Sequence, residues 1–292
     1  MNDARLSLRN DDLLLEVRPG IGGAVTRFER LTSRGVDPIF RAAAEPYRDV
    51  IDSGCYPLVP FSSRVRGGIF VRDGRTITLP PNMAGDRSPL HGQGWRATWT
   101  VERHDERVIE LFYDHEADSW PWWYRAGLRY QLEGAELRVR LTCRNLSADA
   151  MPCGLGLHPM FACEVDTRLD ASVTHVWETD ADLLPVARVP AVGRYDLRDR
   201  AVCGEGLDNA FEGWSGLAEV VSPARDLRVR MTCGDATRLQ VYAPVASGFF
   251  AAEPVQNAIA ALNAPQEQWE SLGIAMLAEG ETATLTVVFA VS

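Results

Sequence analysis

Alternation of apolar and polar residues recurs along this chain and predicts many short β-strands. In residues 137–143, Leu, Val, Leu and Cys alternate with Arg, Arg and Thr; residues 227–233 repeat this pattern, and apolar residues alternate again in 285–291. Because successive side chains of a strand point to opposite faces, each segment is expected to be half buried. Turn sequences such as Asp73-Gly74 and Glu133-Gly134 separate many of the candidate strands.

Helical periodicity is scarce by comparison, and only short stretches such as 39–44 and 266–271 are candidates for helices. Weaker strand candidates occupy much of the remaining chain: 6–8, 13–17, 24–28, 99–103, 108–114, 126–132 and 239–242. No linker-like segment, internal repeat or heptad pattern divides the sequence. The pattern therefore predicts an all-β fold, a large antiparallel β-sandwich formed by one domain over residues 1–292.

Composition and charge argue against several classes of function. The 292 residues are 46% hydrophobic and 24% charged, as in an ordinary globular protein. A formal net charge of −10 repels phosphate backbones, so nucleic-acid binding is not expected. The sequence shows neither a run of about 18 apolar residues nor an N-terminal signal-peptide pattern. We therefore expect a cytoplasmic protein without a membrane span.

The six cysteines have no Cys-x-x-Cys spacing, and several stand in apolar, strand-like runs. This usage predicts buried free thiols rather than a zinc site or a disulfide framework.

A histidine, His158, interrupts the apolar, glycine-spaced run of residues 151–161. A buried polar group without a partner costs about 1–3 kcal/mol, and imidazole exchanges protons near neutral pH. Gly154 and Gly156 leave room beside it for a ligand or another backbone, and Pro159 is expected to end the strand. The run alone leaves a satisfied core histidine and a functional histidine equally open.

Other polar residues stand in similar surroundings. Glu253 lies between apolar residues and a proline, where a carboxyl has a raised pKa unless partners hold its charge. His91, Arg64 and the pair Asp208-Asn209 lie in three segments, 80–95, 55–70 and 203–214, that do not have the pattern of plain strands. A strand-end carboxylate, a turn-capping histidine, an exposed cation and a turn pair are the structural alternatives for these four positions.

Three chemistries can use such a set of residues. Two histidines and a carboxylate can bind iron, but no compact His-x-His motif is present. Two carboxylates suit a glycosidase, although His158 then has no part. Proton shuttling on a sugar, with Glu as base and His as acid, uses every residue.

At six segments, in the same order, the chain resembles the aldose 1-epimerase (mutarotase) family. The segments are Pro57–Gly68 with Arg64, Ser88–Trp95 with His91, the aromatic Trp120–Tyr124, Gly154–Pro159 with His158, Leu207–Trp214 with Asp208, and Phe250–Pro254 with Glu253. Departures occur at Ser63, where Asn is common, at Met160, where an aromatic is common, and at 255–257, where Ser-His is frequent. These departures bear on sugar preference.

The resemblance implies a galactose mutarotase-like supersandwich fold and an isomerase that interconverts the α and β anomers of a free aldose. It implies these roles: Glu253 as general base, His158 as general acid, His91 as an aid near the ring oxygen, and Arg64 and Asp208 as holders of sugar hydroxyls. Stacking of the sugar on Trp123, Trp214 or Phe61 is expected. No metal or organic cofactor is implied.

Two alternatives remain at this point. One is an epimerase of hexose 6-phosphates, whose cationic pocket would draw on Arg64, Arg66 and Arg87; the other is a non-catalytic sugar-binding or sensor module on the same fold. In each case the expected partner is a monosaccharide, and the protein is expected to be a monomer or a homodimer.

Overall fold

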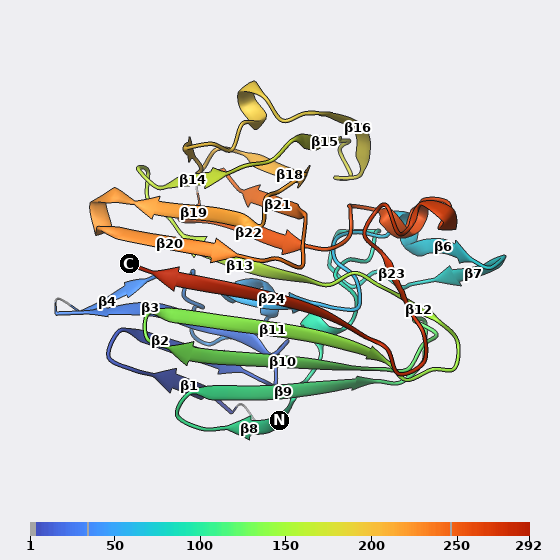
Figure 1. Ribbon diagram of the computed structural model, residues 1–292, viewed down its shortest axis with the longest axis horizontal. Helices are drawn as coiled ribbons and strands as arrows, with labels where there is room; N and C mark the ends of the chain where they lie inside the picture. Colours follow the sequence, from blue (N-terminus) through green and yellow to red (C-terminus); the bar gives the residue numbers. More distant parts are fainter. Residues whose placement is uncertain (1–3, 34, 246) are drawn as a thin grey trace.

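Two large antiparallel β-sheets make up most of the structure, which confirms the all-β sandwich that the alternation predicts (Figure 1). The structure, a computed structural model, describes residues 4–33, 35–245 and 247–292. The strongly alternating segments 137–143, 227–233 and 285–291 fall in strands of the second sheet.

The first sheet has 11 strands, and the candidate site lies on its central strands. In spatial order they are β1 (Leu6–Arg9), β2 (Leu13–Arg18), β3 (Ala24–Thr32), β5 (Cys55–Leu58), β13 (Gly156–Ala162), β22 (Phe249–Val255), β21 (Arg238–Ala243), β18 (Leu207–Glu212), β15 (His175–Thr179) and β16 (Pro185–Pro190), with β4 (Gly35–Pro38) paired to β3.

The second sheet has nine strands and crosses the front of the view in Figure 1. In spatial order they are β17 (Arg200–Ala201), β14 (Arg168–Ala171), β19 (Leu217–Ser222), β20 (Leu227–Thr232), β24 (Thr282–Val291), β11 (Glu136–Asn145), β10 (Tyr124–Glu133), β9 (Val108–His115) and β8 (Thr100–His104). Two further pairs stand apart: β6 (Ile69–Arg72) with β7 (Arg75–Thr78), and β12 (Met151–Cys153) with β23 (Ala275–Leu277).

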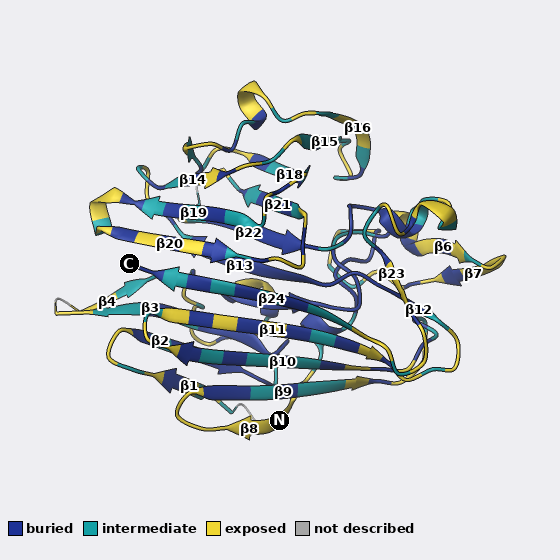
Figure 2. Ribbon diagram, viewed as in Figure 1, coloured by how far each residue is buried: buried dark blue, intermediate teal, exposed yellow. Residues whose placement is uncertain are grey.

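The hydrophobic core lies between the two sheets. Figure 2 shows buried and exposed residues alternating along β11 and β20, as strands with one face on a core require. Phe289 of β24 packs against Phe28, Phe40 and Phe161, with ring centroids 6.5, 5.1 and 6.1 Å away, so aromatic side chains join the second sheet to the first.

The central strands β13 and β22 are buried on both faces. One face packs on the core, and the other faces away from the second sheet and carries the candidate site. This double burial explains why their sequences are nearly continuous apolar runs rather than alternating ones, since both faces avoid water. A polar side chain on either strand is therefore buried.

The prediction that Pro159 ends its strand is wrong, because β13 continues to Ala162. The ladder between β13 and β22 has no bridge between the pairs Gly156–Val255 and Met160–Ala251. Pro159 and Pro254, which lack a backbone N–H, both lie in this gap, so the missing donors cost no ladder bond outside it.

The described residues contain only short 3-10 helices: η1 (Val50–Asp52), η2 (Arg66–Gly68), η3 (Gly94–Arg96), η4 (Gly193–Tyr195), η5 (Pro223–Arg225), η6 (Ala261–Asn263) and η7 (Gln266–Gln268). The helical candidate 39–44 is wrong, since Phe40 instead bridges Phe161 of the first sheet, and 266–271 holds only η7. Within these described ranges, no helix has the length and hydropathy to span a membrane.

The expectation of free thiols is wrong for two of the six cysteines. Cys163 and Cys203 form a disulfide whose Cα atoms lie 5.8 Å apart, a usual separation for such a bond. The partners are 40 residues apart in sequence, and only the fold brings them together. The other four thiols are free and buried, as expected: Cys55, Cys143, Cys153 and Cys233.

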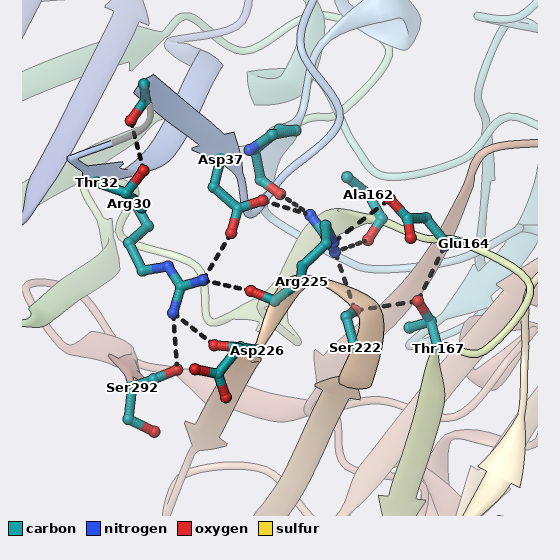
Figure 3. Close-up of polar contacts among 12 residues, drawn as sticks. Arg30, Thr32, Asp37, Ala162, Glu164, Thr167, Ser222, Arg225, Asp226 and Ser292 are labelled. Atoms are coloured by element: carbon teal, nitrogen blue, oxygen red, sulfur yellow. Dashed lines mark hydrogen bonds and ion pairs between the residues drawn. The ribbon is translucent and has the colours of Figure 1, made fainter.

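A polar cluster around Arg225 fastens the far end of β13 (Figure 3). The guanidinium donates to the carboxylate of Asp37 at 3.2 Å, to the carbonyl of Ala162 at 3.0 Å and to the hydroxyl of Ser222 at 3.0 Å. Arg30 binds the other oxygen of Asp37 at 2.8 Å. The cluster thus joins β3, β4 and β13 of one sheet to β19 of the other.

Candidate active site

Strand register brings the two catalytic candidates face to face. The bridges Gly156–Val255 and Met160–Ala251 share one register, and that register sets His158 of β13 opposite Glu253 of β22. Their side chains leave the same face of the sheet, because directly opposed residues of neighbouring strands point the same way. The imidazole Nε2 of His158 lies 3.2 Å from the carboxyl Oε1 of Glu253.

The row continues onto the neighbouring strands. Tyr56 of β5 lies opposite His158, and Gln240 of β21 lies opposite Glu253. The ring of Tyr56 stacks on the imidazole of His158, with centroids 4.5 Å apart and planes 27° from parallel. Four strands thus place a phenol, an imidazole, a carboxyl and an amide side by side on one surface.

Burial dominates the electrostatics of the acid–base pair. His158 is 8% exposed and Glu253 is 3% exposed. Desolvation raises the pKa of Glu253 well above its usual value; the negative charge of Asp208 adds to the shift and the positive charge of Arg64 opposes it. Desolvation also lowers the pKa of His158 to about 3. Both groups therefore favour their neutral forms, and together they hold one proton at neutral pH.

The imidazole of His158 has unused hydrogen-bonding capacity. Nδ1 of His158 is buried and has no hydrogen-bond partner among the described residues. Buried polar groups are nearly always paired, so an unpaired one at a cavity is a candidate for chemistry.

His91 approaches the pair from a loop above the sheet. Its ring centroid lies 5.7 Å from that of His158, nearly perpendicular to it. His91 and Ser63 both have a left-handed backbone, with φ of 64° and 63°, a conformation that costs about 1–3 kcal/mol in non-glycine residues and clusters at functional sites. The two loops are fastened to each other, since the amide of His91 donates to the carbonyl of Ser63 at 3.0 Å.

A second hydrogen bond between these two residues sets the tautomer of His91. Nδ1 accepts a hydrogen bond from the amide of Ser63 at 3.1 Å, so the proton of a neutral ring resides on Nε2. Burial lowers the pKa of His91 well below its usual value, and the charges of His158 and Arg64 act in the same direction. His91 is therefore a neutral donor at the cavity rather than an acid.

Arg64 and Asp208 flank the pair from separate elements. Arg64 donates through Nε to Asp86 at 2.8 Å, which fixes the guanidinium. Asp208 of β18 accepts a hydrogen bond from Gln240 at 2.8 Å, and burial raises its pKa while the charge of Arg64 opposes this rise. Both residues line the cavity of the pair.

Asn257, four residues beyond Glu253, holds the loop that carries Arg64. Its side-chain oxygen accepts hydrogen bonds from the amide and the hydroxyl of Ser62 at 3.0 and 2.8 Å, and its side-chain nitrogen donates to the Ser62 carbonyl at 3.0 Å. A Cβ on Gly154 would lie 2.5 Å from the Asn257 oxygen. Gly154 is expected from the sequence to leave room for a ligand or another backbone, but it makes room for the side chain of Asn257.

These groups open into one cavity of about 440 Å³, within the usual range for small-molecule sites. Five of the residues predicted from sequence line it: Arg64, His91, His158, Asp208 and Glu253. Residues on the cavity wall that sequence reasoning missed are Arg41, Tyr56, Gln240 and Asn257. Register relative to Glu253 could have identified Gln240, but Arg41 lies in a stretch without a distinctive motif.

The aromatic residues expected to stack on a sugar do not line this cavity. Trp123 is 51% exposed, next to the start of β10. Trp214 is buried and donates to the carbonyl of Leu217 at 2.8 Å, and Phe61 packs in the core against Trp120 at 5.4 Å. These rings lie in the core or on the surface. The sequence alone does not distinguish such an aromatic residue from one that stacks on a sugar. In the described part of the chain, no group of three or more His, Cys, Asp or Glu residues is arranged to hold a metal ion.

Comparison with known proteins places this arrangement in context. A family model described as aldose 1-epimerase matches residues 4–290. The uncharacterized protein YphB of Escherichia coli K12 is 30% identical over 212 residues, which are 72% of this chain and 71% of YphB.

Solved structures match over nearly the whole chain. A candidate aldose 1-epimerase of Escherichia coli K12 has a TM-score of 0.90 and 28% identity, with 99% of each chain covered. A galactose mutarotase-like protein of Clostridium acetobutylicum has a TM-score of 0.86 and 19% identity, covering 98% of this chain and 94% of its own. The second likeness is evidence for the fold alone.

Proposed function

Because this chain belongs to the aldose 1-epimerase family, we propose that it interconverts the α and β anomers of an aldose by acid–base catalysis. The observation that carries this proposal is the contact of His158 Nε2 with Glu253 Oε1 at 3.2 Å on the floor of the cavity. A binding module has no need of an acid and a base side by side, so the contact favours catalysis over a silent sugar-binding or sensor protein.

The proposed reaction moves one proton between two oxygens of the sugar. Glu253 takes the proton of the anomeric hydroxyl, and His158 gives a proton to the ring oxygen, so the ring opens to the aldehyde. Rotation about the C1–C2 bond turns the other face of the aldehyde toward the ring hydroxyl. Reclosure then proceeds with the two proton transfers reversed, and both side chains return to their first state.

The pKa directions fit this scheme when the pair is treated as one unit. Burial favours neutral Glu253 and neutral His158, which together hold one proton. Carboxylate and imidazolium also hold one proton together, so a transfer across the 3.2 Å contact produces the reactive form. A hydrogen bond from the sugar hydroxyl to Glu253 stabilises the carboxylate and assists that transfer.

The remaining residues orient the sugar. His91 donates from Nε2 toward the ring oxygen, while Arg64 and Asp208 bind hydroxyls with a donor and an acceptor of opposite charge. Arg66 and Arg87 do not line the cavity, so the phosphate pocket considered for a hexose 6-phosphate epimerase lacks two of its three expected cations.

Mutarotation followed by polarimetry tests the proposal. Wild type, Glu253→Gln and His158→Asn are compared on fresh solutions of α-D-glucose and α-D-galactose, with the uncatalysed rate subtracted. We expect each substitution to remove nearly all of the protein's acceleration, since general acid–base groups contribute about 10²–10⁴-fold. Glu116→Gln, at an exposed position, is the matched control and keeps the wild-type rate. Unchanged rates in both site variants would overturn the proposal.

A further inference from the structure

Three arginines line the cavity, and they differ in how their charge is compensated. Arg64 pairs with Asp86 at 2.8 Å, and Arg238 pairs with Glu212 at 3.4 Å. Within the described residues, Arg41 forms no ion pair with any carboxylate. The exposed Asp52 acts on its charge only through space, together with the phenols of Tyr47, Tyr56 and Tyr242.

The protein nevertheless holds the guanidinium of Arg41 in one place. Nε and Nη2 donate to the carbonyl of Ser53 at 3.1 and 2.7 Å, and Nη2 also donates to the carbonyl of Ile51. The group lies over the ring of Phe249, with its central carbon 4.2 Å from the ring centroid. Nη1 has no protein partner in the described part of the chain, so one donor nitrogen of a fixed cation is available to a ligand.

The two carbonyls and the ring of Phe249 hold the guanidinium of Arg41 in place, but they do not neutralise its charge. Burial lowers the pKa of Arg41, which means that its cation is partly removed from water. A partly buried cation is usually paired with an anion, because carbonyls and a ring face offset only part of the lost hydration. In a cavity, a ligand can supply that anion.

The position of Arg41 defines which part of a ligand it can reach. Its amide donates to the carbonyl of Met160 at 2.7 Å, two residues along β13 from His158, and its guanidinium covers Phe249, four residues along β22 from Glu253. At about 3.3 Å per residue, Arg41 therefore lies roughly 7–13 Å from the acid–base pair along the strands. An aldose with C1 at the pair presents its far end to Arg41.

We propose that the cavity selects an aldose that carries an anionic group at the end farthest from C1, and that Arg41 binds this group. The inference rests on the proposed function, since it places C1 at Glu253 and His158. A carboxylate, as in a hexuronate, and a phosphate, as in a hexose 6-phosphate, offer the same chemistry: an oxyanion that accepts a charge-assisted hydrogen bond from the guanidinium.

The experiment compares sugars that differ only at C6. Anomer exchange is measured by NMR for glucose, glucuronate and glucose 6-phosphate, after subtraction of the uncatalysed rate, with wild type, Arg41→Met, Arg41→Lys and Arg66→Met. Arg41→Met keeps an unbranched apolar side chain without the charge, Arg41→Lys keeps the charge, and Arg66→Met removes an exposed arginine outside the cavity. Thermal unfolding of each variant shows whether it is folded.

We expect wild type to turn over at least one anionic sugar with a kcat/KM roughly tenfold to a hundredfold above that for glucose, the range of a charged hydrogen bond. The anionic sugar that is preferred identifies the group as carboxylate or phosphate. In Arg41→Met, the ratio of kcat/KM for the preferred anionic sugar to kcat/KM for glucose falls toward one. The ratio is partly kept in Arg41→Lys and is unchanged in Arg66→Met.

A kcat/KM for glucose equal to or above that for both anionic sugars in wild type would overturn the inference. If that exchange still depends on Glu253, the proposed function stands and only the selection of an anion fails. If no sugar exchanges faster with wild type than with Glu253→Gln, the proposed function itself fails.

Discussion

Strand β13 has one polar cluster at Ala162 and another around His158, and the two clusters differ in how charge is compensated. At Ala162, Arg225 meets a carboxylate, two carbonyls and a hydroxyl, so its charge is neutralised and most of its donors are used (Figure 3). Near the other end, His158 meets one oxygen of Glu253, and its second nitrogen has no partner in the described residues.

The difference distinguishes charged groups that hold the chain together from titratable groups that can react with a ligand. Charges that meet several partners stay in one protonation state and fix the geometry of the chain. Titratable groups with few partners in a low-dielectric site shift their pKa and can exchange protons with a ligand. Burial alone therefore does not identify an active site; two titratable groups that face each other in a cavity with few other partners are the better indicator.

The sharpest test of this comparison is to separate activity from stability at Glu253. Glu253→Gln is expected to lower the catalysed rate about 10²–10⁴-fold without lowering the unfolding free energy at pH 7. An amide of the same shape carries no charge, and burial already disfavours the charged carboxylate. Polarimetry measures the catalysed rate and urea unfolding measures the unfolding free energy. A large loss of unfolding free energy would mean that Glu253 stabilises the fold, as Arg225 does.

The opposite outcome is expected at the other end of the strand. Arg225→Met leaves the half-buried Asp37 with Arg30 as its remaining cation, and should cost about 2 kcal/mol of unfolding free energy. The kcat of the folded fraction should stay within about twofold of wild type. Arg228→Met, which removes an exposed ion pair of β20, is the control and should change stability by less than about 1 kcal/mol. Loss of kcat with stability retained would contradict the comparison.

The pH dependence of stability provides a third test. Between about pH 4.5 and 6.5, the unfolded chain holds one proton on His158 and the folded chain holds one on Glu253, so the pair adds no slope. Below this window the unfolded carboxyl also protonates, and stability falls as the pH drops toward the folded His158 pKa of about 3. Above it the unfolded imidazole loses its proton while Glu253 keeps one, and stability falls as the pH rises.

Single substitutions should reveal the two opposing slopes, each up to about 1.4 kcal/mol per pH unit. With His158→Asn, only Glu253 remains, and stability should fall as the pH rises above about 4.5. With Glu253→Gln, only His158 remains, and stability should fall as the pH drops below about 6.5. Urea unfolding from pH 3 to pH 8 measures both, and parallel profiles for the two variants would refute the shared proton.

The smallest effect is expected at Trp123. Because this ring is 51% exposed and outside the cavity, Trp123→Ala should leave kcat/KM within about twofold of wild type. Steady-state mutarotation measures this, with Tyr56→Ala as the counterpart that removes a ring stacked on His158. A tenfold loss for Trp123→Ala would mean that the sugar extends beyond the cavity.

Local sequence patterns predicted the strands well where one face meets water. The segments in β11, β20 and β24 alternate because one side packs on the core, and this physical cause acts residue by residue. Prediction was poorer for Pro159, since a proline ends a strand only where its missing N–H breaks a ladder bond. The two tryptophans were misplaced relative to the cavity because apolar rings suit a core, a surface or a sugar equally.

The sequence by itself determined the fold class and the chemical character of the site: an imidazole and a carboxyl in apolar runs are buried whichever strands they join. Tertiary structure decided everything that depends on pairing between distant segments. The register of β13 with β22 put His158 against Glu253, Asn257 fixed the loop of Arg64, and Cys163 met Cys203 across 40 residues. These contacts depend on the alignment of neighbouring strands, where a shift of one residue would turn every side chain to the other face.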